Sequence, residues 1–183
     1  MLRDYICTIP SKTVNKMKNI GIFYGSTTGT AEELAGQIAA KLNVDKSHIH
    51  DVASAGLADV DPYDVLILGT STWGAGDLQD DWQDFASKLK SKDLSGKIVA
   101  FFGCGDSYSY DTTFCDGVGE LYQDLQGTGC AFCGAYTPEG YNFSGSTAVV
   151  DGKLVGLVVD QINEEDKTEE RMETWLSTLK NCL

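Results

Sequence analysis

A loop rich in hydroxyl groups lies between an apolar run and a pattern typical of an amphipathic helix. The apolar run covers residues 20–24, and the loop covers residues 26–30 (STTGT). The first N–H groups of a helix have no intrahelical partner, and the helix dipole favours negative charge there. The hydroxyls would add neutral donors, and Gly29 would let the backbone approach an anion closely. The loop therefore predicts a phosphate site.

The phosphate site is not that of a nucleotide hydrolase. No lysine or arginine lies between Gly25 and Gln37, whereas the GxxxxGK[ST] loop requires a lysine. Neutral donors alone suit a permanently bound cofactor better than a nucleotide that must turn over. For this loop taken alone, an ordinary turn between a strand and a helix remains the alternative.

Two further glycine-rich loops follow short apolar runs. They are residues 69–77 (GTSTWGAGD) and residues 103–110 (GCGDSYSY). In a doubly wound parallel sheet, the loops after the central strands emerge at the carboxyl edge, where ligands bind. Each of these two loops carries an aromatic residue, Trp73 or Tyr110, that could stack on a flat ligand. Together the three loops predict a planar, phosphorylated cofactor.

Repeated strand and helix patterns would position these loops. Apolar runs at 20–24, 65–68 and 98–102 lack polar alternation, as expected of strands buried on both faces. Residues 48–50 predict a shorter, exposed strand, and residues 130–136 predict the last one. Three helices are expected from one-sided apolar positions: Leu34, Ile38 and Leu42; Phe114, Val118, Leu121, Tyr122 and Leu125; Met172, Trp175, Leu176 and Leu179. We expect an α/β fold with a five-stranded parallel sheet, helices on both faces, and a last strand interrupted by an inserted loop or hairpin.

Composition limits the class of protein. The 183 residues are 42% hydrophobic and carry a formal charge of −13, which argues against nucleic acid or an anionic membrane as a partner. The charge favours a basic protein partner, with solubility alone as the alternative. No apolar run approaches the ~20 residues of a membrane span, and we expect a cytoplasmic protein. Residues 1–16 do not join the pattern, so we expect an extension or cloning remnant there and one domain over residues 17–183.

Cysteine and histidine give no catalytic set. Cys130 and Cys133 match CxxC, but in a strand they would point to opposite faces, too far apart for a disulfide. No second CxxC or suitable histidine pair completes a zinc site. We expect buried, reduced thiols. We also expect His48 and His50 to be solvated edge residues rather than metal ligands.

The chain resembles the flavodoxin family, in its long-chain type, from about Met17 onward. The motifs that carry the resemblance are YGSTTGT, TSTWGAGDLQDDW, GCGDSYSYDTTFCDG and YNFSGSTAVVDGKLVGLVVD, in this order. Each motif is weak alone, whereas all four in sequence are specific. The resemblance implies the strand order 2-1-3-4-5 and non-covalently bound FMN at the carboxyl edge of the sheet.

The resemblance also implies a role for residues in each loop. The FMN phosphate would be held by Ser26, Thr27, Thr28, Gly29 and Thr30. Trp73 would stack on one face of the isoalloxazine ring and Tyr110 on the other. The ring edge and ribityl chain would meet backbone groups of Thr72, Gly74, Ala75, Gly76, Cys104, Gly105 and Asp106. Ala31 stands where the family usually has a hydroxyl residue, so one phosphate bond is lost or supplied by Thr30. Ser71 stands where the family often has proline.

The function implied by the resemblance is electron transfer. The chain would be a low-potential one-electron carrier, not an enzyme, that shuttles FMN between semiquinone and hydroquinone. Its partners would be basic redox proteins, such as a ferredoxin/flavodoxin-NADP reductase or other low-potential donors and acceptors, and it would act as a monomer. Asp77, Asp80, Asp81 and Asp84 are either a docking face or a solvated helix face. The alternative function is an FMN-dependent NAD(P)H or quinone reductase, although aromatic rings on both faces of the flavin would block hydride access.

Overall fold

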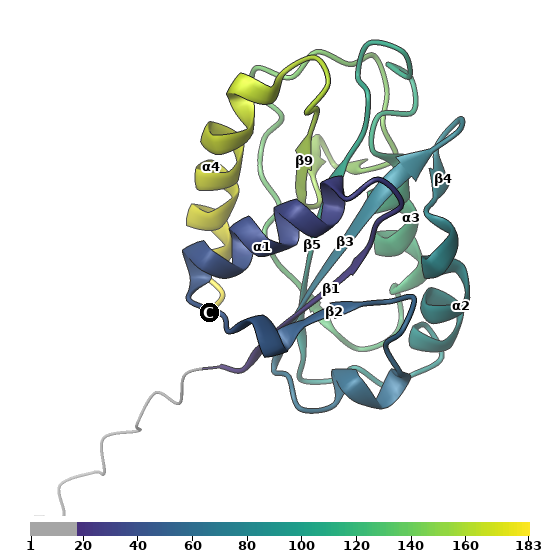
Figure 1. Ribbon diagram of the computed structural model, residues 1–183, viewed down its shortest axis with the longest axis vertical. Coiled ribbons are helices and arrows are strands. Elements are labelled where there is room, and N and C mark those ends of the chain that lie inside the picture. The colour runs from purple at the N-terminus through teal and green to yellow at the C-terminus, as the bar shows by residue number, and fades with distance from the viewer. Residues whose placement is uncertain (1–17) are drawn as a thin grey trace, which may run out of the picture.

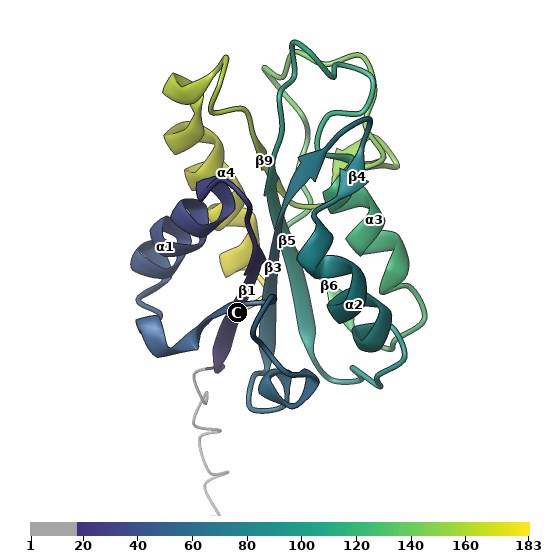
Figure 2. The same ribbon diagram turned by 45° about the vertical axis from the view of Figure 1, so that its right-hand side comes forward.

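A parallel sheet runs through the centre of the molecule, with helices on both of its faces (Figures 1 and 2). The structure is a computed structural model that describes residues 18–183, so the prediction for residues 1–16 lies outside the described residues. The strands are β1 (Ile20–Gly25), β2 (Ile49–Asp51), β3 (Val65–Trp73), β4 (Asp77–Leu78), β5 (Ile98–Cys104), β6 (Ala131–Phe132), β7 (Val149–Val150), β8 (Lys153–Leu154) and β9 (Leu157–Val159). The main order is β2-β1-β3-β5-β6, with parallel pairing throughout, which confirms the predicted topology.

The fifth strand position is split by an insertion, as predicted. Strand β6 pairs with the start of β5, where Ile98 faces Ala131, and β9 pairs with its end, where Phe102 faces Leu157. The residues between them contain the antiparallel hairpin β7–β8. Strand β9 follows Gly156, where a Cβ atom would lie 2.3 Å from the carbonyl oxygen of Phe101. Only glycine allows the returning chain to approach β5 this closely.

In residues 18–183, four α-helices cover the sheet. They are α1 (Thr30–Leu42), α2 (Asp80–Leu89), α3 (Asp116–Asp124) and α4 (Thr168–Lys180), with short 3-10 turns at Lys46–His48, Leu57–Val60 and Glu165–Lys167. Figure 2 shows α1 and α4 on one side of the sheet and α2 and α3 on the other. Phe114 and Leu125 are buried as predicted but lie just outside the ends of α3. Within residues 18–183, no helix is both long and apolar enough to cross a membrane.

The apolar runs form the core because the parallel strands are covered on both faces. Leu66, Ile67 and Leu68 of β3 have no exposed surface, and neither does Phe101 of β5. Burying a side chain of this size contributes about 1.5–3 kcal/mol. Helix α2 is fixed through Trp82, whose indole N–H donates a hydrogen bond of 2.8 Å to the carbonyl oxygen of Gly69 in β3.

The prediction for the cysteines is partly wrong. Cys133 and Cys182 form a disulfide, with their Cα atoms 6.5 Å apart. Cys133 pairs not with its near neighbour in sequence but with a cysteine at the end of the chain, which the packing of α4 on the sheet brings to it. Cys104, Cys115 and Cys130 are free thiols, as predicted.

The histidines lie at the far edge of the sheet. His48 is exposed and His50 is half-buried, on or beside β2. The Tyr63 hydroxyl lies 3.1 Å from His48 Nδ1 and 2.7 Å from His50 Nε2. Burial lowers the pKa of His50. Among residues 18–183, no cluster of His, Cys, Asp and Glu side chains could hold a metal ion.

Candidate functional site

The carboxyl ends of β1, β3 and β5 bring the three predicted loops together (Figure 1). Gly25 pairs with Thr70, and Ser71 pairs with Cys104, so the chain leaves the three strands at the same level. A cleft of about 300 Å³ lies between the loops. Its lining residues are Thr28, Thr30, Ser71, Thr72, Trp73, Gly74, Cys104, Gly105, Asp106, Tyr110, Gln161 and Ile162. Nine of these twelve were predicted from the sequence, while the other predicted residues lie beside the cleft.

A larger cavity lies elsewhere in the molecule. It has a volume of about 630 Å³ and lies between α4 and the inserted segment at residues 136–141. None of the three predicted loops contributes to its lining. The smaller cleft has the donors and aromatic rings that a cofactor site needs, so volume alone does not identify the site.

The first loop leaves backbone donors free at the start of α1. Gly29 adopts a φ of 92°, and its N–H donates to Ser26 Oγ at 3.1 Å. The first helical bond runs from the N–H of Glu33 to the carbonyl of Gly29. Within residues 18–183, the N–H groups of Thr30, Ala31 and Glu32 therefore have no hydrogen-bond acceptor. These groups can bind an anion. The Ala31 side chain is buried, so this residue has only its N–H to offer.

Two aromatic rings line the cleft. Trp73 is 42% exposed and Tyr110 is 48% exposed, which is unusual for large apolar side chains in this molecule. The Trp73 indole N–H donates to Ser71 Oγ at 3.0 Å, and Ser71 is buried. Ser71 therefore orients the indole ring, a role that sequence reasoning missed. The arrangement can hold a flat ligand by stacking.

The loop after β3 forms a tight turn into β4. The N–H of Gly76 donates to the carbonyl of Trp73 at 3.1 Å, which closes the turn around Gly74 and Ala75. Gly74 has a φ of 53° and Gly76 a φ of 119°, both in the region that favours glycine. A Cβ atom at Gly74 would lie 2.9 Å from the Asp77 carboxylate. A larger residue at Gly74 is therefore strained.

The third loop is stabilised by hydrogen bonds to the carboxylate of Asp106, a residue of the same loop. Asp106 accepts hydrogen bonds from the N–H groups of Ser109 at 2.9 Å and Tyr108 at 3.0 Å. The bond from Ser109 is the main reason that the pKa of Asp106 is lowered, and Asn163 contributes as well. At the end of β5, burial raises the pKa of the Cys104 thiol to about 12, with a further contribution from the charge of Asp160. The wall of the cleft therefore carries a neutral thiol.

Comparison with known proteins identifies the family. The family profile described as Flavodoxin matches residues 22–175. The chain belongs to the flavodoxin family. A flavodoxin of Nostoc sp. is 39% identical over 164 residues, which cover 90% of this chain and 96% of that protein. Flavodoxin 1 of Escherichia coli K12 is 38% identical over 164 residues, which cover 89% and 93%.

Solved structures agree with the family assignment. The structure of Fusobacterium nucleatum flavodoxin bound to flavin mononucleotide superposes with a TM-score of 0.84 at 29% identity, over 91% of this chain and 99% of that one. Flavodoxins are electron-transfer proteins rather than enzymes, so the prediction of an electron carrier is confirmed at the level of the family. The long-chain type and the roles of individual residues stay predictions.

Sequence reasoning missed Asp160, which joins two walls of the flavodoxin cleft. Its carboxylate is fully buried and accepts hydrogen bonds from the N–H and hydroxyl of Ser107 at 2.8 and 2.6 Å. It also accepts bonds from the N–H groups of Ile162 and Asn163, both at 2.9 Å. The sequence signal is an aspartate directly after a strand with asparagine three residues later, a pattern typical of an Asx turn.

Asp160 makes a testable contribution to stability. Burial opposes its ionisation, but hydrogen bonds from Ser107 and Asn163 outweigh burial and lower its pKa. Asp160→Asn should lower the free energy of unfolding by about 2 kcal/mol at pH 7, since bonds to a charged group are lost. A carboxylate whose pKa is lower in the folded than in the unfolded protein stabilises the folded state at pH values above the unfolded pKa. The difference in free energy of unfolding between wild type and Asp160→Asn should therefore shrink below about pH 4.

Urea denaturation of both proteins at pH 7 and pH 3 measures this effect. The control is Asp84→Asn, which neutralises an exposed carboxylate paired with Lys88 on the surface of α2 and should change stability by less than about 0.5 kcal/mol. A difference between wild type and Asp160→Asn that grows in acid would contradict the assigned role.

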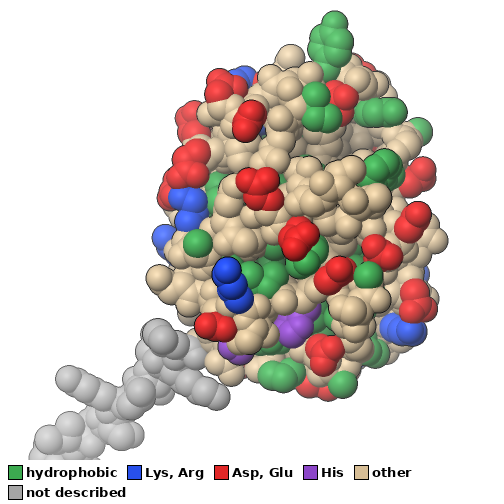
Figure 3. Space-filling view, viewed as in Figure 1, with side chains coloured by type: hydrophobic (Ala, Val, Ile, Leu, Met, Phe, Trp, Pro, Cys, Tyr) green, Lys and Arg blue, Asp and Glu red, His purple; other side chains and the backbone are tan. Residues whose placement is uncertain are grey.

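The surroundings of the cleft are acidic. No lysine or arginine is among its lining residues. Four exposed carboxylates lie beside the second loop, on β4 and α2: Asp77, Asp80, Asp81 and Asp84. Figure 3 shows acidic side chains spread over the visible face with few basic ones between them. An anion bound in the cleft would depend on neutral donors for its affinity.

Proposed function

We propose that this chain is a low-potential one-electron carrier that binds FMN non-covalently in the cleft between the three loops. One observation carries the proposal: two half-exposed aromatic rings lie beside a helix N-terminus whose first N–H groups have no protein acceptor. A flat ring and a phosphate on one ligand would satisfy both features. The FMN-bound relative from Fusobacterium nucleatum, which has the same fold, supports this choice of ligand.

Each loop has a distinct task in the proposed complex. The phosphate would be bound by hydroxyl and N–H groups of Ser26, Thr27, Thr28, Gly29, Thr30 and Ala31. Trp73 and Tyr110 would enclose the two faces of the ring and exclude water from them. Backbone groups would meet the ring edge and ribityl chain at Thr72, Gly74, Ala75, Gly76, Cys104, Gly105 and Asp106.

The protein would favour single-electron steps through its electrostatics. FMN supplies the redox chemistry, and we propose that it cycles between semiquinone and hydroquinone. The cleft has no basic side chain in its lining, and the formal charge of the chain is −13. Desolvation between two rings and repulsion by nearby carboxylates both oppose a second negative charge on the ligand. These effects would lower the potential at which the second electron is accepted.

Gly74 gives a test of the first electron step. Membership of the family implies that the peptide at Gly74 turns its carbonyl toward the ring when the first electron arrives. Glycine has little strain in either orientation, so Gly74→Ala should weaken this step by about 1 kcal/mol and lower the first midpoint potential by about 40 mV. Anaerobic potentiometric titration measures it. Gly96→Ala is the control, because Gly96 also has a positive φ (83°) but lies before β5, away from the cleft. An unchanged first potential in Gly74→Ala would contradict the role.

The proposed partners are basic redox proteins, such as a ferredoxin/flavodoxin-NADP reductase or other low-potential donors and acceptors. Opposite charge steers such partners together and speeds their encounter, and salt screens the attraction. We propose no nucleic-acid or membrane partner, and we propose that the chain acts as a monomer in the cytoplasm. The four exposed carboxylates on β4 and α2 would contribute to docking: Asp77, Asp80, Asp81 and Asp84.

Binding and turnover test the proposed function. The purified protein should be yellow or should take up FMN at micromolar concentration, and it should not oxidise NADPH until a reductase is added. A colourless protein that refuses FMN would overturn the proposal. Rapid NADPH consumption without a reductase would instead favour an FMN-dependent NAD(P)H or quinone reductase.

A further inference from the structure

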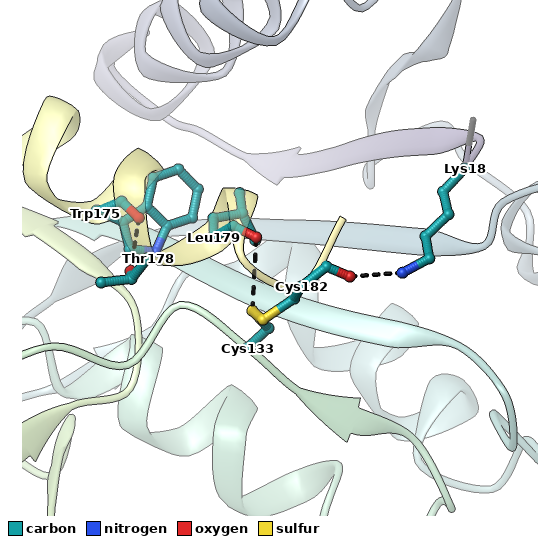
Figure 4. Close-up of a disulfide and its surroundings, with 6 residues drawn as sticks. All are labelled: Lys18, Cys133, Trp175, Thr178, Leu179 and Cys182. Carbon is teal, nitrogen blue, oxygen red and sulfur yellow. Dashed lines mark hydrogen bonds between the residues drawn. A yellow bond between two sulfur atoms is a disulfide. The ribbon is translucent and has the colours of Figure 1, made fainter. Parts of the chain in front are cut away.

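The disulfide between Cys133 and Cys182 ties the end of the chain to the split fifth strand (Figure 4). Cys133 follows β6 directly, and its N–H donates to the carbonyl of Val99 at 2.9 Å. The carbonyl of Cys182 accepts a hydrogen bond of 2.5 Å from Lys18 Nζ, just before β1. This junction lies at the end of the sheet opposite to the cleft, near the C-terminus in Figure 1.

The disulfide is placed where a reagent in solution can reach it. Both cysteines line a surface cavity of about 620 Å³; Cys133 is buried, so a reagent reaches the bond from the side of Cys182. Cys182 is half-buried and lies two residues beyond Lys180, the last residue of α4. Its sulfur can therefore move away when the bond opens without unwinding a helical turn. Access to the attacked sulfur, here that of Cys182, is a requirement of thiol–disulfide exchange.

The core does not depend on the bond. Helix α4 packs on the sheet through side chains that are almost fully buried: Met172, Trp175, Leu176 and Leu179. Arg171 on the same helix pairs with Glu164 at 2.5 Å and lies 3.9 Å from the centre of the Tyr141 ring. We therefore expect the reduced protein to stay folded.

The bond nevertheless constrains a functional part of the chain. The two cysteines are 49 residues apart, and the closed loop contains β9, the turn at Asp160 and all of α4. A disulfide restricts the unfolded chain and so opposes its unfolding. Opening the bond should make this segment, which includes the Gln161 and Ile162 wall of the cleft, easier to unfold.

We propose that Cys133–Cys182 is a reversible thiol–disulfide exchange site for dithiol reductants. A thiolate of the reductant attacks the Cys182 sulfur and releases the Cys133 thiolate, which takes up a proton. The second thiol of the reductant then attacks the mixed disulfide, releases Cys182 as a thiol, and leaves as a cyclic or intramolecular disulfide. Two electrons and two protons pass to the cystine. In reducing compartments, the disulfides that do occur are usually of this transient kind.

The attacking thiol comes from solution rather than from Cys130. Cys130 is close in sequence, but burial raises the pKa of its thiol, and Thr128 Oγ1 lies 3.3 Å from its sulfur. A protonated thiol is a poor nucleophile. Removing Cys130 should therefore leave the exchange unchanged.

Alkylation of the folded protein tests the proposal. The full chain, oxidised in air, is treated with iodoacetamide before and after incubation with dithiothreitol, and the labelled peptides are mapped by mass spectrometry. Half-buried Cys182 should be protected before reduction and labelled after it, while buried Cys104 and Cys115 stay unlabelled. The melting temperature should fall by about 5–10 °C on reduction and return on reoxidation.

Two variants complete the test. Cys182→Ser should have the melting temperature of the reduced wild type, and dithiothreitol should not change it. The melting temperature of Cys130→Ser should fall on reduction as that of wild type does. In the reduced protein, amide exchange should accelerate in residues 157–180 and not in α2. Labelling of Cys133 and Cys182 in the oxidised protein would overturn the proposal. Continued protection against dithiothreitol, or loss of the response in Cys130→Ser, would overturn it as well.

Discussion

Tyr110→Ala should raise the dissociation constant of FMN about 30-fold. Tyr110 is one of the two aromatic rings that line the cleft, and it is half-exposed. Stacking of an aromatic side chain on a flat heterocycle contributes about 1–3 kcal/mol, and 2 kcal/mol corresponds to a factor of about 30. Titration of FMN into the apo-protein, followed by the quenching of flavin fluorescence, measures the constant.

Tyr108 provides the matched control for this prediction. It belongs to the same loop and is 84% exposed, but it is not among the lining residues of the cleft. Tyr108→Ala should leave the dissociation constant within about twofold of wild type, and Tyr110→Phe, which keeps the ring, should do the same. If Tyr110→Ala and Tyr108→Ala bind FMN equally well, Tyr110 does not stack on the cofactor.

Thr28→Asp should weaken FMN binding about 100-fold and leave riboflavin binding unchanged. Thr28 lines the cleft beside the free N–H groups of α1, and no basic side chain in the lining offsets an added carboxylate. Repulsion between that carboxylate and the phosphate at a few ångströms is worth about 3 kcal/mol at the edge of a protein. Riboflavin lacks the phosphate, so its affinity separates charge repulsion from damage to the loop.

The control for Thr28→Asp adds the same charge elsewhere. Thr174 is exposed on α4, away from the cleft, and Thr174→Asp should not change the affinity for either flavin. Both flavins are titrated into each variant by the same fluorescence assay. If Thr28→Asp weakens the binding of riboflavin as much as that of FMN, the substitution has distorted the loop, and the phosphate does not lie beside Thr28.

Local pattern was enough to predict the central strands and the loops that form the cleft, while the strand order came from the family resemblance. Strands that are buried on both faces show as continuous apolar runs, so β1, β3 and β5 and the loops after them were evident in sequence. Once strand order is known, chain connectivity alone places those loops at one edge. Trp73 and Tyr110 therefore both line the cleft, as expected.

What the sequence did not reveal depends on contacts between distant segments. Asp160 accepts a hydrogen bond from Ser107, which lies 53 residues earlier in the chain. Cys133 forms a disulfide with a cysteine 49 residues later. Such pairs leave no periodic signal, because only the packing of β9 and α4 decides which side chains meet. Ser71 was noted as a departure from the family, yet its bond to Trp73 depends on a rotamer that sequence does not encode.

Anaerobic reduction of the FMN-loaded protein with dithionite, followed by absorbance, decides whether the chain carries electrons one at a time. An electron carrier of the proposed kind should turn from yellow to blue after one electron per flavin, in most of the molecules, and bleach only with the second. Direct bleaching from yellow to colourless, with no blue form at any point of the titration, would contradict the account.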